Sequence, residues 1–202
     1  MQTLSIWSYK IYISEKQDWN ARNFDDFFVC KQVHWNEIFL LENNDKKNIN
    51  SDWIITDCLH TKIWGLTADC NGIILMWKKY FGVVHAGRKW LKKNIVSKWI
   101  KILQDKGEKK SEIIVFIWPS IKKCCYEVWD EFLDYFDKKY FTKKWQKHHF
   151  DMIEFLYDQL TNLWIDKDKI KVHEECTKCW SNFFSYRNWD LNDRIIIWVE
   201  KN

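Results

Sequence analysis

Five short apolar runs follow one another in the first half of the chain, and several of the connections between them are too short to hold a crossover helix. The runs cover residues 37–42, 52–56, 63–67, 72–77 and 80–86. Parallel neighbouring strands need a dozen or more connecting residues, so short connections indicate antiparallel pairs. We therefore expect an α+β layered sandwich, with a mixed β-sheet and flanking helices, rather than a doubly wound parallel fold.

Helical periodicity begins after these runs. Over residues 90–104, apolar side chains recur at helical spacing with lysines between them, and Gly107 follows as a stop signal. Residues 130–140 and 149–164 are predicted to be further helices, and residues 112–117 and 194–199 are predicted to be strands. No linker, low-complexity segment or internal repeat interrupts the 202 residues, so we expect a single domain over 1–202.

Nothing in the sequence indicates a membrane or secreted protein. No window approaches the run of roughly eighteen uncharged apolar residues that a membrane-spanning helix needs. The opening segment, MQTLSIWSYK, lacks the basic stretch, apolar run and cleavage site of a secretory signal. We expect a soluble, cytoplasmic protein. Its net charge of +4 comes from intermixed acids and bases, which argues against a nucleic-acid partner.

The seven cysteines form an odd set that contains the adjacent pair Cys124 and Cys125, so we expect reduced thiols rather than a disulfide framework. In the first half, His34, Cys70 and His85 are the metal-capable side chains near predicted strand ends. Two histidines and one thiolate are a zinc ligand set that leaves a fourth position for water or substrate. The alternative is that these three side chains bind no metal and are simply packed in the protein.

A second candidate metal site lies in the segment from His173 to Cys179, which has the spacing His-x-x-Cys-x-x-Cys. Joined by Cys124 or Cys125, it would resemble a structural zinc knot. Cysteines acting as small buried apolar side chains are the alternative. The serine-hydrolase, P-loop and dinucleotide-binding classes have no support, because G-x-S-x-G, Walker A and G-x-G-x-x-G motifs are missing from the sequence.

Six segments, in order, resemble the motifs of the bacterial YfiH/YlmD family, described as laccase-domain polyphenol oxidases and also as purine nucleoside phosphorylases with adenosine deaminase activity. They are QVHW (32–35), LTADC (66–70), VVHAGRKW (83–90), WPSIKKCCYEVW (118–129), ECT (175–177) and FFSYRNWD (183–190). The resemblance implies the YfiH-like layered fold, once grouped with putative cysteine hydrolases. It covers roughly residues 30–190, so residues 1–30 form a shortened, divergent N-terminal region.

The resemblance also implies a function for the first metal candidate. The family binds zinc, or copper in the oxidase interpretation, on the residues that match His34, Cys70 and His85. The implied activity is a zinc-dependent purine nucleoside phosphorylase with adenosine deaminase activity, whose partners are purine nucleosides and phosphate. Asp69 and Cys70 are the expected catalytic residues, although Asp69 is equally consistent with a turn cap. The expected substrate-binding residues are Arg88, Cys125, Tyr126 and Arg187.

Two other functions remain open from the sequence. A copper-dependent polyphenol oxidase is possible because His/Cys sites also accept copper. A non-catalytic, zinc-stabilised RNA-binding or adaptor module is the other alternative. The sequence does not indicate an oligomeric state.

The chain departs from the family pattern mainly at glycine. Its 15 tryptophans and 5 glycines reverse the usual abundance of these residues. Tryptophan stands at family glycine positions at Trp35, Trp90, Trp118, Trp129 and Trp189, and Trp19 and Trp164 are further candidates. Glycine is common at turns because it adopts positive φ without a steric penalty. We hypothesise that the gene comes from an organism whose genetic code uses UGA for glycine. These positions would then be glycine codons that were translated as tryptophan when the sequence was derived from the DNA.

Overall fold

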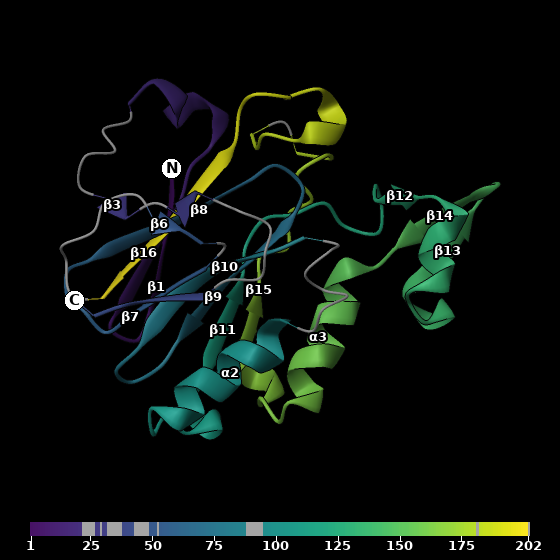
Figure 1. Ribbon diagram of the computed structural model, residues 1–202. Helices are drawn as coiled ribbons and strands as arrows, with labels where there is room; N and C mark the ends of the chain where they lie inside the picture. The colour runs from purple at the N-terminus through teal and green to yellow at the C-terminus, as the bar shows by residue number, and fades with distance from the viewer. Residues whose placement is uncertain are drawn as a thin grey trace.

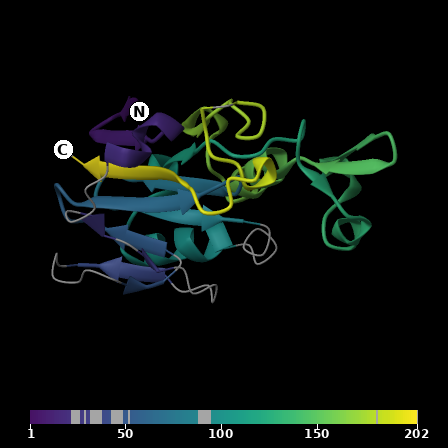
Figure 2. The same cartoon turned by 90° about the horizontal axis from the view of Figure 1, so that it is seen from above.

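The fold is a three-layer sandwich in which two β-sheets pack face to face and helices cover the outer face of one sheet (Figures 1 and 2). The computed structural model describes residues 1–21, 27–28, 30–31, 38–42, 49–51, 53–87, 95–180 and 182–201. The two α-helices of this part are α2 (Ile95–Asp105) and α3 (Met152–Asn162). The predicted α+β sandwich with a mixed sheet is confirmed.

The central layer is a six-stranded sheet in the order β15-β11-β9-β10-β7-β5. Its strands are β5 (Ile38–Leu41), β7 (Trp53–Thr56), β9 (Asn71–Met76), β10 (Phe81–Ala86), β11 (Ile114–Ile117) and β15 (Ile170–Val172). The pairs β15–β11 and β5–β7 are parallel, and the other three pairs are antiparallel. The short connection between β9 and β10 is an antiparallel turn, as expected. The short connections from β7 to β8 and from β8 to β9 instead lead from one sheet to the other, because β8 belongs to the second sheet.

Strand β9 shows why this sheet is central, because all six of its residues are buried. Ile73 and Leu75 belong to the core that contains the apolar side chains of α2 and α3. Ile74 and Met76, which point to the other face of the sheet, belong to the core shared with the second sheet. The unbroken apolar run from Ile73 to Met76 is the pattern expected for burial on both faces.

The second sheet has five strands in the order β1-β2-β16-β8-β3. Its strands are β1 (Gln2–Ile6), β2 (Tyr9–Ile13), β3 (Phe27–Phe28), β8 (Lys62–Thr67) and β16 (Ile195–Lys201). The predicted closing strand is thus present and pairs with β2 on one side and β8 on the other. The β1–β2 hairpin was not predicted. A two-stranded pair, β4 (Cys30–Lys31) with β6 (Ile49–Asn50), lies apart from both sheets.

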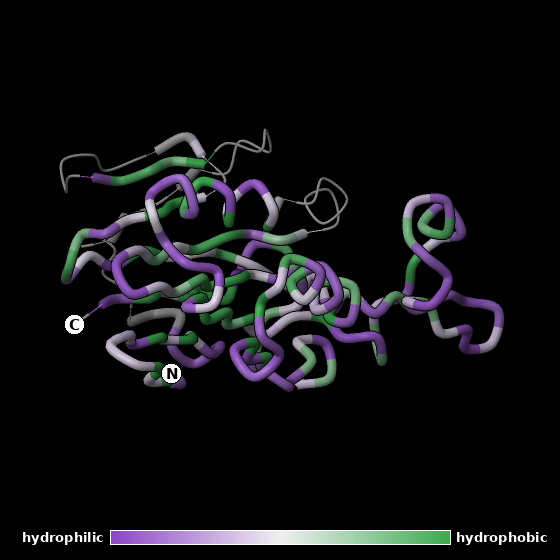
Figure 3. The backbone as a smooth tube through the Cα atoms, turned by 90° about the horizontal axis from the view of Figure 1, so that it is seen from below, coloured by the Kyte–Doolittle hydropathy of each residue, from purple (hydrophilic) through white to green (hydrophobic). Residues whose placement is uncertain are grey.

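A small sheet projects from the side of the sandwich (Figures 1 and 2). It contains β12 (Glu127–Val128), β13 (Phe141–Lys144) and β14 (Lys147–Phe150) in the order β12-β14-β13. Its hairpin is coloured largely hydrophilic in Figure 3, in contrast to the apolar strands of the sandwich. We call residues 127–150 the arm.

The arm accounts for two predictions that were wrong. The helix predicted over 130–140 is instead two short 3₁₀ turns, Asp130–Asp134 and Lys138–Tyr140. The aromatic side chains of this segment, Phe132, Phe136 and Tyr140, pack on Phe150. The helix predicted over 149–164 begins only at Met152, because His149 and Phe150 pair within the arm's sheet. For the helix predicted over 90–104, the described helix is α2, and residues 90–94 lie outside the described residues.

Remaining 3₁₀ turns cover Lys16–Ala21, Lys110–Glu112, Lys167–Lys169 and Tyr186–Asn188. Among the helices that the structure describes, none is long and apolar enough to cross a membrane.

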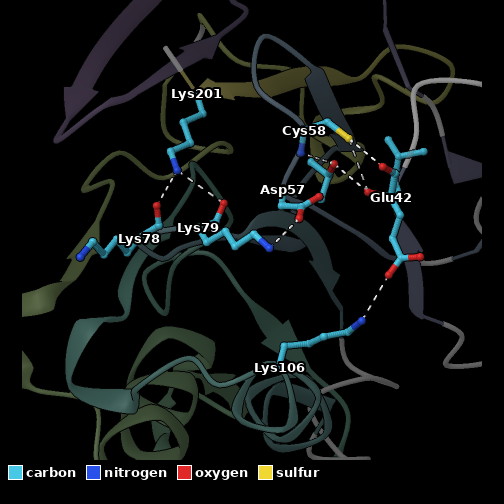
Figure 4. Close-up of polar contacts among 9 residues, drawn as sticks. Glu42, Asp57, Cys58, Lys78, Lys79, Lys106 and Lys201 are labelled. Carbon is cyan, nitrogen blue, oxygen red and sulfur yellow. Dashed lines mark hydrogen bonds and ion pairs between the residues drawn. The ribbon is translucent and has the colours of Figure 1, made fainter.

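Polar contacts fasten one end of the sandwich, where the β9–β10 hairpin turns (Figure 4). Lys201 of β16 donates to the carbonyl oxygens of Lys78 and Lys79, and Lys79 forms an ion pair with Asp57 at 3.2 Å. The thiol of Cys58 lies 3.4 Å from the carbonyl oxygen of Glu42 at this same end. Each exposed ion pair here is weak by itself, but the set joins both sheets, and we call this the closed end.

Candidate active site

Those predicted site residues that the structure describes gather at the other end of the sandwich, opposite the closed end. The strand register explains this, because Gly72 pairs with His85, Ile73 with Ile117, and Ile195 with Thr67. Strands β9 and β16 therefore begin where β8, β10 and β11 end, and β15 runs parallel to β11. The segments that follow or precede these strand ends are residues 68–70, 87, 118–126, 173–179 and 185–190. They carry five of the six family-like motifs.

Cys70 and His85 converge beside Gly87. A Cβ atom placed on Gly87 would lie 3.3 Å from Cys70 Sγ and 3.3 Å from His85 Nε2. The sulfur and the nitrogen thus border the same small space, which only a residue without a side chain leaves open. A thiolate and an imidazole facing one space fit a zinc ion. Of the three predicted ligands, these two come together, while His34 lies outside the described residues.

The Cys70 thiol holds its proton tightly in the absence of a metal. Burial raises the pKa of Cys70 to about 11, and the negative charge of Asp69 adds to the rise. Binding of a metal ion by this sulfur would therefore release a proton. The indole of Trp118, which is fully buried, donates from Nε1 to the carbonyl oxygen of Cys70 at 3.4 Å and so fixes the backbone next to the sulfur.

Asp69 joins three of the motif segments. One carboxylate oxygen accepts a hydrogen bond from Thr177 Oγ1 at 2.6 Å, and the other accepts from the backbone N–H of Arg187 at 2.8 Å. Its carbonyl oxygen accepts from the N–H of Ile121 at 3.0 Å. Asp69 is 7% exposed and has a positive φ of 80°. Because both carboxylate oxygens are engaged, these contacts describe a positioning residue; its catalytic role stays a prediction.

Arg187 and Tyr126 lie against each other on the outer side of Asp69. The Arg187 guanidinium carbon is 5.5 Å from the centre of the Tyr126 ring, and Nη2 donates to the carbonyl oxygen of Glu127 at 3.0 Å. Tyr126 packs edge-on against Phe132 of the arm. The structure thus brings together two of the predicted substrate-binding residues. A third, Arg88, lies outside the described residues.

Cys125, the fourth predicted substrate-binding residue, belongs to a cluster of cysteines. Its sulfur lies 3.2 Å from that of Cys179, and Cys124 Sγ lies 3.6 Å from the same atom. The cluster is completed by Cys176, and all four sulfurs lie within 4.8 Å of one another. We call it the four-cysteine cluster.

The four-cysteine cluster corrects the predicted zinc knot. His173 is not one of the members, because its Nε2 contacts the Gln2 side chain at 2.9 Å instead. Both adjacent cysteines, Cys124 and Cys125, take part rather than one of them. The signal available in the sequence was the pairing of one Cys-Cys with one Cys-x-x-Cys, since two such pairs can supply four sulfurs.

An open groove lies beside this end, between β1 and the segment that follows β15. Its lining includes Leu4, Phe116, His173, Glu175 and Trp180. Of the predicted active-site residues that the structure describes, none lines it, whereas His173 of the predicted zinc knot does.

Comparisons with known proteins agree with this architecture. Residues 15–195 match the sequence profile of the family described as multi-copper polyphenol oxidoreductase laccase. A purine nucleoside phosphorylase of Aquifex aeolicus is 35% identical over 172 residues, which are 85% of this chain and 81% of the relative. A purine nucleoside phosphorylase of Clostridium acetobutylicum is 31% identical over 193 residues, covering 89% of this chain and 80% of the relative.

Solved structures show the same fold. The hypothetical protein YfiH of Bacillus licheniformis superposes with a TM-score of 0.78 at 22% identity, over 92% of this chain and 78% of that chain. YlmD of Geobacillus stearothermophilus gives a TM-score of 0.77 at 23% identity, over 92% of this chain and 77% of that chain. The profile match spans most of the sequence and the fold agrees with it, so the chain belongs to the laccase-domain family that includes YfiH and YlmD.

Proposed function

We propose that this chain is a zinc-dependent purine nucleoside phosphorylase, which uses phosphate to cleave the bond between a purine and its ribose. The observation that carries the proposal is the convergence of Cys70 Sγ and His85 Nε2 beside Gly87. The relatives named purine nucleoside phosphorylase in Aquifex aeolicus and Clostridium acetobutylicum support the substrate class.

Cys70 and His85 would hold the zinc ion, and we propose His34 as the third ligand. A sulfur and two imidazole nitrogens form a known catalytic ligand set for zinc that leaves a coordination position open. Zinc bound there supplies Lewis acidity at neutral pH. Trp118 and Asp69 keep the backbone around Cys70 in place through the hydrogen bonds described above.

Arg187 is the residue best suited to bind an anionic oxygen. Its guanidinium uses one N–H for the carbonyl of Glu127 and stacks over the Tyr126 ring. Guanidinium forks suit phosphate oxygens because they present several fixed donors. In phosphorolysis, a phosphate oxygen bonds to the anomeric carbon, the bond from that carbon to the purine nitrogen breaks, and this nitrogen gains a proton. Arg187 would orient the phosphate, and the Tyr126 side chain would line the same pocket.

The same site would also deaminate adenosine. In that reaction water replaces the amino group on the purine ring, and ammonia leaves. The two activities give different products, namely adenine with ribose 1-phosphate in the first and inosine in the second. In phosphorolysis, Asp69 would act by positioning Arg187 through its backbone N–H.

The test is a nucleoside assay on protein purified without oxygen. Wild-type chain with adenosine and phosphate should form ribose 1-phosphate. Cys70→Ala should lose about a hundredfold or more of this activity, because even groups that only support a metal ligand change activity by about 10–100-fold. The matched control is Cys58→Ala, which removes a thiol at the closed end and should retain activity. Full activity of Cys70→Ala would overturn the proposal.

A copper-dependent polyphenol oxidase is the second candidate, favoured by the description of the family as laccases. Oxygen uptake with a phenol, by copper-loaded protein that does not turn over nucleosides, would support it instead. Salt-dependent RNA binding without either activity would favour the non-catalytic alternative.

A further inference from the structure

We propose a second, structural zinc site that is separate from Cys70 and His85 and whose ligands are Cys124, Cys125, Cys176 and Cys179. It does not depend on the proposed enzymatic activity. The four sulfurs come from two segments that lie more than fifty residues apart in the sequence and meet at the base of the arm.

The distances match a tetrahedral centre. With Zn–S bonds of about 2.3 Å, the sulfurs of a four-thiolate zinc site lie roughly 3.8 Å from one another. Here, two of the separations are 3.2 Å and 3.6 Å, and no pair exceeds 4.8 Å. Small side-chain rotations would therefore equalise the six separations around one ion.

The backbone holds both cysteine pairs in tight turns. In the first, the N–H groups of Cys125 and Tyr126 both donate to the carbonyl oxygen of Lys122 at 2.9 Å. In the second, the N–H groups of Cys179 and Trp180 donate to the carbonyl oxygen of Cys176 at 3.1 Å and 3.0 Å. Sulfurs carried on hydrogen-bonded turns lose little conformational freedom on binding a metal.

The two turns are also joined to each other. Thr177 N–H donates to the carbonyl oxygen of Ser120 at 3.2 Å, next to the bridge between Ser120 and Cys176. Lys122 N–H lies 3.4 Å from Cys176 Sγ. A backbone N–H aimed at a sulfur favours the thiolate that binds a metal. The surroundings are basic as well, since Lys144 Nζ lies 3.4 Å from the carbonyl oxygen of Cys124.

Zinc is the expected ion because a site of four thiolates in tetrahedral arrangement selects zinc or iron. Its role would be structural, since four protein ligands leave no open position. The site would connect the arm to the segment that carries Thr177, which donates to Asp69. It would also fix Tyr126, the neighbour of Cys125, against Arg187. Loss of the site should therefore loosen one wall of the candidate active site.

The test counts zinc per chain after purification without oxygen. Wild type should hold two ions, and Cys70→Ala one. The double variant Cys124→Ser/Cys179→Ser should also hold one, and both of its cysteines are exposed, so the core is unchanged. The matched control Cys58→Ser should hold two. An unchanged zinc content in the double variant would overturn the site. Loss of both ions in the double variant, where wild type holds two, would overturn its independence.

A second measurement does not depend on a variant. Cobalt added to metal-free wild type should give the sulfur-to-cobalt absorption of a four-thiolate centre, stronger than that of the double variant, which retains only the single-thiolate site. A disulfide among these cysteines in protein kept from oxygen, detected as a mass lighter by two hydrogens, would contradict the proposal. Zinc content and absorption do not require nucleoside turnover, so failure of this site and failure of the proposed function are distinguishable.

Discussion

At the scale of single residues, tryptophan occupies backbone conformations that normally require glycine. Six non-glycine residues have positive φ in the part of the chain that the structure describes, and four of them are Trp7, Trp145, Trp164 and Trp189. All four are between 62% and 97% exposed. A left-handed backbone costs a residue with a Cβ about 1–2 kcal/mol, and exposed indoles gain little from burial to offset it.

The positions of these residues are those of turn glycines. Trp7 and Trp145 are the first residues of two-residue hairpin loops, where glycine is preferred. Trp164 follows α3 at the position where Gly107 follows α2. In both cases, the same pair of backbone hydrogen bonds closes the helix end, from Trp164 and Ile165 in α3 and from Gly107 and Glu108 in α2.

We predict that Trp164→Gly raises the free energy of unfolding by about 1 kcal/mol, because it relieves the left-handed strain at φ 68°. Urea denaturation monitored by circular dichroism measures this. The matched control is Trp129→Gly, since Trp129 is also exposed but has φ −80°. Glycine there should give no gain, because it only increases the freedom of the unfolded chain. Equal effects of the two substitutions would contradict the strain argument.

The coding DNA gives an independent check of the glycine hypothesis. UGA codons at positions 7, 145, 164 and 189 would agree with it, and UGG at all four would contradict it. Trp118 and Trp129 match family glycines, yet the structure does not give either a positive φ. Trp35 and Trp90 lie outside the described residues. Among the candidate glycine positions that the structure describes, Trp164 and Trp189 are thus the ones whose backbone calls for glycine.

A second prediction at this scale concerns Thr177, whose hydroxyl donates to the buried Asp69 carboxylate. Thr177→Val keeps the shape but leaves that oxygen with one partner fewer, which should cost about 1–3 kcal/mol of stability. Thr177→Ser retains the hydroxyl and should lose less. Unfolding by urea separates the two variants, and equal stability of Thr177→Val and wild type would show that the bond contributes nothing.

At the scale of elements, the strands of the central sheet and helix α2 could be predicted because their side chains are periodic. The runs at 72–77 and 80–86 correspond to β9 and β10 within one residue at each end. The predicted helix over 130–140 was wrong for a physical reason. Its apolar side chains, such as Phe132 and Phe136, pack on Phe150 from a distant hairpin, and periodicity within one segment does not report such a contact.

The start of α3 was predicted too early, although its capping residue was visible in the sequence. Asp151 Oδ1 accepts a hydrogen bond from the N–H of Glu154 at 3.1 Å, which marks Asp151 as the N-cap. The pairing of His149 and Phe150 in β14 stops the helix from extending backwards. The capping signal was thus a better guide to the boundary than the hydrophobic pattern.

We predict that Asp151→Ala lowers the free energy of unfolding by about 1 kcal/mol through loss of this cap. Asp151→Asn is the matched control, because it keeps a side-chain oxygen that can accept the bond. Asp151→Asn also removes the ion pair between Asp151 and Lys123. Because the Lys123 side chain is largely exposed, this ion pair contributes little to stability. Denaturant unfolding compares the two, and a loss as large in Asp151→Asn as in Asp151→Ala would assign the effect to the ion pair.

At the scale of the whole molecule, the site depends on contacts that no single motif reveals. Cys70 and His85 were expected near strand ends, and the pairing of β9 with β10 brings them together. The link from Asp69 to Thr177 and Arg187 spans more than one hundred residues of sequence. The four-cysteine cluster likewise needs β11 and β15 side by side. Such long-range pairings follow from the fold rather than from local spacing.

Strand β16 lies inside the five-stranded sheet, between β2 and β8. It follows every other described strand in the sequence, so during translation the β1–β2 hairpin is made long before β16, its neighbour in the sheet. Before β16 is in place, their sheet lacks its central strand. The side chains of Ile11, Ile13 and Ile63, which are fully buried in the folded protein, are then not fully covered. We therefore expect assembly to start from the central sheet and its helices, and a nascent polypeptide halted before Ile195 to expose unpaired strand edges that favour chaperone binding or aggregation.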